Sequence, residues 1–201
     1  MNAQTMFLLR YRPDHPGISS NHTGMSRRML ADLSEEQVRR PPCPGVNTLA
    51  WLVWHMARVE DIGVNRFVTD GEQVFDSGDW GRRLGVTRRD LGTGMTPDEV
   101  LELSARIDVP ALHDYWDAVE ERTLAVVQAL RPEDLDTILD ATHVQRIFAN
   151  DALDTPDAVW VCDYMENQPR GFFLIHLALT HLYVHWGEAQ AIRGLYGHPG
   201  R

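Results

Sequence analysis

The chain has 201 residues, of which 43% are hydrophobic, and its formal net charge at pH 7 is −10. A chain of this length buries a full core without disulfides, so we expect one domain over residues 1–201 and free thiols at Cys43 and Cys162, in the cytoplasm. The negative charge argues against a nucleic-acid partner, and the absence of any apolar run approaching ~20 residues argues against a membrane partner.

The first part of the chain predicts helices separated by polar or Pro-rich breaks. A helix is expected over about residues 23–33, and the capping box 34–37 opens a short turn after it. The Pro-rich run 40–45 ends that turn. Asn47 or Thr48 then caps a helix with an apolar stripe at i, i+3 and i+4 spacing, which consists of Trp51, Leu52, His55, Val59 and Ile62.

The middle of the chain begins with a long surface connection, residues 70–94, anchored by Trp80 and Leu84 and able to fold over a site. A second capping box at 96–99 starts a helix to about residue 106, and a longer helix follows over about 109–130. In residues 136–170 the hydrophobic periodicity that would predict a helix or a strand is weakest.

The last expected helix runs over about residues 172–195 and ends at Gly197, a position suited to a left-handed cap. Since no alternating pattern is long enough to build a sheet, the fold class is all-α.

Two histidines four residues apart on this last helix indicate a metal site. At ~100° per residue, His181 and His185 fall about 40° apart on one helix face, in an apolar stripe that also carries Glu188. His55 faces the core from another helix, and three histidine ligands with an open position suit Zn²⁺. His176 lies five positions before His181, about 140° round an α-helix, so we expect that it is not a ligand.

Other interpretations of these residues are open at this point. A histidine pair at this spacing also occurs by chance or as stacked surface residues. A lone core-facing histidine such as His55 is a weaker signal than the pair. Cys43 is a possible nucleophile, but its neighbours in Pro-Pro-Cys-Pro-Gly include no base that would activate it.

Two segments, residues 47–61 (NTLAWLVWHMARVED) and 181–194 (HLYVHWGEAQAIRG), resemble the DinB-like superfamily of four-helix metalloproteins. This superfamily includes mycothiol-dependent maleylpyruvate isomerase and the bacillithiol and mycothiol S-transferases. The resemblance implies a four-helix bundle with a long crossover connection and short accessory helices, and His55, His181 and His185 as metal ligands. Where the family usually has Gln three residues beyond the last ligand, this chain has Glu188.

The function that the resemblance implies is metal-dependent transfer, isomerisation or hydrolysis, in which a low-molecular-weight thiol or water attacks an electrophilic small molecule. The expected metal is zinc, with nickel, iron or copper as alternatives. Glu188 and Arg58 are the candidate catalytic residues, and Glu60 or Asp61 is a candidate for orienting the substrate or the ligand imidazoles. The alternative is a non-catalytic metal-binding stress-response protein.

A second apolar patch on the last helix, Leu179, Tyr183 and Trp186, lies roughly opposite the metal face. A helix that is apolar on both sides must bury both. We therefore expect a homodimer formed through this patch. The competing expectation is that the patch packs under the 70–94 connection.

Overall fold

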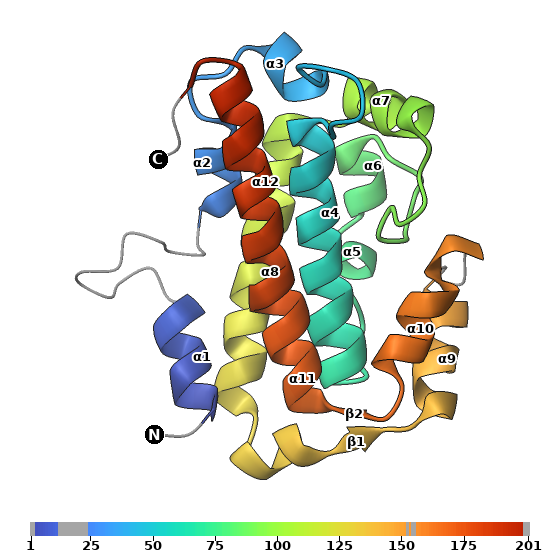
Figure 1. Ribbon diagram of the computed structural model, residues 1–201. Helices are drawn as coiled ribbons and strands as arrows, with labels where there is room; N and C mark the ends of the chain where they lie inside the picture. Colours follow the sequence, from blue (N-terminus) through green and yellow to red (C-terminus); the bar gives the residue numbers. More distant parts are fainter. Residues whose placement is uncertain (1–2, 12–23, 152, 154–155, 199–201) are drawn as a thin grey trace.

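The computed structural model describes residues 3–11, 24–151, 153 and 156–198, and this part of the chain is almost entirely helical (Figure 1). Three long helical stretches run side by side. The first is α4 (Leu49–Ile62) with the π-helical turn η1 (Gly63–Val68), and the second is α8 (Val109–Ala129). The third comprises α11 (Arg170–Ile175), the π-helical turn η4 (His176–Thr180) and α12 (His181–Leu195).

The fourth position of the bundle is shared by two short helices, α1 (Ala3–Tyr11) and α2 (Met25–Leu30) (Figure 1). The sequence predicted a longer helix here, from Thr23, which lies outside the described residues, to Leu33. The helix ends earlier because Ala31 is extended and Asp32 has a φ of 62°, a left-handed conformation that an α-helix cannot contain.

The long crossover from α4 to α8 contains three short helices, α5 (Val74–Ser77), α6 (Trp80–Leu84) and α7 (Pro97–Arg106). Trp80 and Leu84 are buried, as expected for its anchors. The weakly patterned region before α11 also folds, into η2 (Pro132–Asp136), α9 (Ala141–Asn150), η3 (Pro156–Ala158) and α10 (Val159–Met165). Its ends pair as two short antiparallel strands, β1 (Ile138–Leu139) and β2 (Gln168–Pro169).

The predicted helix boundaries are confirmed where a side chain caps the helix. Ser34 forms the capping box of α3 (Glu35–Arg39), and Thr96 forms that of α7. Of the two candidate caps for α4, Thr48 is the one used, because its side chain accepts a hydrogen bond from the Trp51 backbone. Gly197 has a φ of 80°, which is the left-handed cap expected after α12.

Helix α4 lies at the centre of the molecule and is buried on every side, from Leu49 to Ile62. The sequence predicted burial of one stripe only, because polar residues such as Arg58, Glu60 and Asp61 alternate with it. These three side chains are instead buried in polar networks formed with other elements. No helix of the described residues is long and apolar enough to cross a bilayer.

The apolar patch of Leu179, Tyr183 and Trp186 is covered within the same chain. Leu179 is buried, the guanidinium of Arg10 in α1 lies over the Tyr183 ring, and that of Arg28 in α2 lies over the Trp186 ring. Neither the 70–94 connection nor a second chain is needed to cover it, because the two N-terminal helices occupy that side of α12. A homodimer stays a prediction, but this patch no longer supports it, because the same chain covers the patch.

A buried acidic pair lies where α1, α4 and α8 meet. The Glu60 carboxyl group accepts hydrogen bonds from Tyr11, Trp116 and Thr123. Glu120 is only 4% exposed, and burial together with the nearby Glu60 raises its pKa to about 9. Glu120 therefore keeps its proton at neutral pH in the folded protein.

Glu120→Gln is expected to stabilise the protein at pH 8. Between the ordinary pKa of 4.5 and about 9, the unfolded chain releases a proton that the folded chain retains, so the free energy of unfolding falls as pH rises. A neutral glutamine removes this decrease in the free energy of unfolding, which is on the order of 3 kcal/mol at pH 8. Thermal melting at pH 4.5 and pH 8 measures it. The gain should vanish at pH 4.5, and the exposed neighbour Glu121→Gln should show no gain at either pH.

Candidate metal centre

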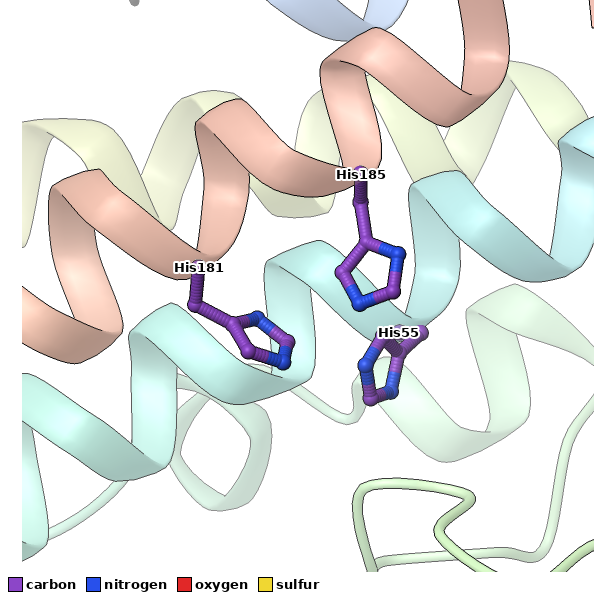
Figure 2. Close-up of side chains that lie close together, drawn as sticks. All are labelled: His55, His181 and His185. Carbon is purple, nitrogen blue, oxygen red and sulfur yellow. The ribbon is translucent and has the colours of Figure 1, made fainter.

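Three histidines from two helices converge in the middle of the bundle. His55 comes from α4, and His181 and His185 come from α12, so that the three rings face one another (Figure 2). One nitrogen of each lies within 4.8 Å of the others. The ring centroids are 5.1 Å apart for His55 and His181, 4.9 Å for His55 and His185, and 4.6 Å for His181 and His185. The three histidines singled out in the sequence thus lie together in the structure.

Burial keeps the imidazoles of His55 and His181 neutral. Desolvation lowers the pKa of His55 to about 4 and that of His181 to about 2, with the neighbouring histidines adding to the effect. A neutral imidazole has a free lone pair, which is the form that binds a metal ion. At pH 7 a cation would therefore not have to displace a proton from either side chain.

Hydrogen bonds orient two of the rings. The Nδ1 of His55 lies 2.5 Å from the carbonyl oxygen of Leu91, and the Nδ1 of His185 lies 2.7 Å from Oε2 of Glu188. Both partners are acceptors, so Nδ1 carries the proton in each ring and Nε2 is left free. The Trp51 ring stacks on His55 at 4.7 Å between centroids and at an angle of 6°, which fixes the plane of that imidazole.

Glu188 is tied into the same arrangement by a second hydrogen bond, from Nδ2 of Asn47 at 2.8 Å. Burial alone would raise the pKa of the Glu188 carboxyl, but the hydrogen bonds from His185 and Asn47 outweigh it and hold the pKa below its ordinary value. Glu188 is therefore a carboxylate that faces the back of His185. It orients the His185 ring, and the catalytic role expected of Glu188 from the sequence stays a prediction.

The Nδ1 of His181 is buried and has no hydrogen-bond partner. Leaving such a group unsatisfied costs about 1–3 kcal/mol. Neutral imidazoles bind borderline cations such as Zn²⁺, Ni²⁺ or Cu²⁺. Nδ1 of His181 is a buried polar atom of this cluster that no hydrogen bond satisfies. The donor set therefore fits a divalent metal ion.

His176 lies nearer to the centre than α-helical geometry predicts. The π-helical turn η4 places residues five apart close together, and the His176 ring lies 6.3 Å from that of His181. The argument from a 140° separation is therefore wrong at this point of the chain. His176 instead stacks on Phe172, at 5.2 Å and 12°, and it is not among the histidines whose nitrogens converge. Its exclusion as a ligand stays a prediction.

Arg58 does not contact the histidine cluster, although it lies one helical turn from His55. Its buried guanidinium donates to Asp61, Tyr115, Gln73 and the carbonyl oxygen of Arg89. It thereby fastens the 70–94 connection to α4, two residues before the carbonyl of Leu91 that binds His55. Asp61 has the same role, because it accepts hydrogen bonds from the backbone of Val74 and Phe75.

Glu60 takes part in the acidic pair with Glu120, and its carboxyl group accepts hydrogen bonds from Tyr11, Trp116 and Thr123. In the structure Arg58, Glu60 and Asp61 take part in buried hydrogen-bond networks, and the roles in the reaction expected of them from the sequence stay predictions. Two participants were missed. The carbonyl of Leu91 is a backbone group without any signal in the sequence, and Asn47 drew attention only as a helix cap.

Comparison with known proteins finds a matching family model and a solved structure with a similar fold. A sequence model of the DinB superfamily matches residues 20–189. The crystal structure of a conserved protein from Enterococcus faecalis is similar, with a TM-score of 0.60 and 19% sequence identity over 86% of this chain and 89% of that one. At that identity the likeness concerns the fold. No curated protein matches the chain.

Proposed function

This chain belongs to the DinB superfamily, and on that premise we propose that it is a metal-dependent enzyme. In this proposal His55, His181 and His185 hold one divalent cation, with zinc expected first. A water molecule or a low-molecular-weight thiol reacts there with an electrophilic small molecule. The observation that carries the proposal is the convergence of three imidazoles within 4.8 Å of one another, two of them with Nε2 left free.

When bound, the cation supplies Lewis acidity, which lowers the pKa of a water or thiol that reaches it. The residues of the chain do the rest. Three neutral imidazoles leave the positive charge of a cation undiminished, while Leu91 and Glu188 keep two of the rings from rotating. The Glu188 carboxylate adds one negative charge behind His185, which increases the electron donation of that ring.

Glu188→Ala is expected to lower metal affinity about 10- to 100-fold, because His185 loses the acceptor that orients it. Glu188→Gln should fall between this variant and the wild type, since its amide oxygen still accepts from Nδ1 without the negative charge. Competition with a chromophoric chelator measures the affinities. Equal affinities for all three proteins would show that the hydrogen bond to His185 has no effect on binding.

The experiment that tests the proposed function starts with protein purified without a metal-affinity tag. Elemental analysis is expected to find one divalent ion per chain, and a screen of thiols against electrophiles should give turnover that chelation removes. The non-catalytic alternative predicts a different pattern. In that case chelation unfolds the bundle, and the metal-loaded protein has no activity in the screen.

A further inference from the structure

A groove of about 680 Å³ lies between the segment 40–48 and the start of α7. We infer that this groove binds the small molecule on which the metal centre acts, and that the molecule is a largely apolar anion. The inference rests on the proposed function for the identity of its ligand as a substrate. The volume lies within the range of about 300–1,000 Å³ that is typical of small-molecule sites.

The chemistry of the lining determines the class of ligand. Most of the lining is apolar, and it includes Pro41, Pro44, Val46, Met95, Val100 and Leu101. Among the described residues that line it, Arg40 is the only cationic side chain and none is Asp or Glu, although the chain as a whole carries a net charge of −10. An apolar body with one negative group therefore matches this surface better than a cation or a strongly polar molecule does.

Two short chains of contacts join the groove to the histidines. Asn47 lines the groove and donates to Glu188 at 2.8 Å, and Glu188 binds His185 at 2.7 Å. Met95 also lines the groove, and its sulfur accepts from the Trp51 indole at 3.2 Å. That indole stacks on His55. In each chain of contacts one residue lies between a lining residue of the groove and a proposed ligand, namely Glu188 in the first and Trp51 in the second.

The groove and the cluster are also close along α4. Thr48 lines the groove and His55 lies seven residues further on, which corresponds to about 10 Å along the helix axis. Both chains of contacts and helix α4 therefore connect the groove to two of the proposed ligands, His55 and His185. The groove would then select the substrate, and the histidines would provide the site of reaction.

The test uses 8-anilinonaphthalene-1-sulfonate, an apolar probe with one sulfonate, titrated by fluorescence into the metal-loaded protein. We expect one saturable site, lost in Leu101→Trp, which fills the groove. Arg40→Gln should weaken binding about two- to fivefold, as loss of one exposed charge pair does, whereas Arg82→Gln should have no effect. Arg40 is exposed, so its variant keeps the test valid if Leu101→Trp does not fold.

A matched control addresses an exposed apolar surface away from the groove, on α10, where Trp160 is 68% exposed. Trp160→Ser should leave the titration unchanged. Loss of binding in Trp160→Ser, or full binding in a folded Leu101→Trp variant, would place the probe elsewhere and overturn the inference. Failure of the wild type to bind the probe would overturn it as well.

Proton relaxation of the bound probe tests the connection to the metal centre. With paramagnetic Co²⁺ in place of Zn²⁺, relaxation of the probe should be faster in the wild type. If Co²⁺ is retained and relaxation does not change, the groove does not serve the centre and the inference fails. If Co²⁺ does not bind at all while the fluorescence titration is intact, the proposed metal function fails and the groove remains a binding site.

Discussion

Replacing His181 by alanine is expected to lower metal affinity by about two to three orders of magnitude. Binding energies of protein zinc sites, about 10–16 kcal/mol in total, correspond to a few kcal/mol for each ligand lost. Within the described residues only His55, His181 and His185 form a group that could hold an ion, so no other ligand is placed to replace the missing one. The fold should be retained, because Nδ1 of His181 has no hydrogen-bond partner to lose. Titration with Co²⁺, followed by its absorption spectrum, measures the effect.

His176→Ala is the matched control for this experiment. Its ring lies 6.3 Å from that of His181 but stacks on Phe172, so removing it should leave stoichiometry and affinity at their wild-type values. A His181→Ala variant that binds one ion with wild-type affinity would refute the proposed site. A His176→Ala variant that loses the ion would instead make His176 a ligand and change the coordination that we propose.

The second large effect is expected from Gly63→Ala, at a close approach between the two helical stretches that carry the three histidines. A Cβ at Gly63 would lie 2.5 Å from Cβ and 2.9 Å from Cδ1 of Leu177. Because one of these atoms is next to the backbone, the helices must move apart, and overpacking of this kind costs about 1–3 kcal/mol. His181 follows Leu177 by one turn, so the movement should also weaken metal binding. Thermal melting and Co²⁺ titration measure the two effects.

Gly187→Ala provides the control with the opposite sign. Gly187 lies within α12, is exposed, and has no atom within 4 Å of the position of an added Cβ. Alanine there should stabilise the protein by about 0.5–1 kcal/mol, since glycine is a poor residue inside a helix. Equal melting temperatures for the Gly63 and Gly187 variants would contradict the close approach at Leu177 as the source of the effect.

The sequence by itself determined the features that depend on neighbouring residues. Thr96 and Gly197 could be assigned as caps, and Thr48 as one of two candidates with Asn47, because a cap acts within a few residues of its own helix. The pairing of His181 with His185 follows from helix periodicity in the same way. The choice of His55 as the third member came from its core-facing stripe and from the family resemblance, and the tertiary structure brings it to the pair.

Only the tertiary structure decided which groups surround the cluster. The carbonyl of Leu91 reaches His55 because Arg58 fastens a segment 31 residues further along the chain, and Asn47 reaches Glu188 across 141 residues. Contacts between distant parts of the chain also bury Arg58 and pack α1 and α2 over Tyr183 and Trp186. Contacts between residues so distant along the chain leave no periodic or local pattern in the sequence. The π-helical turn η4, just before His181, packs against η1, which is far away in the sequence. This turn places His176 closer to His181 than an α-helix would, and the sequence pattern did not predict it.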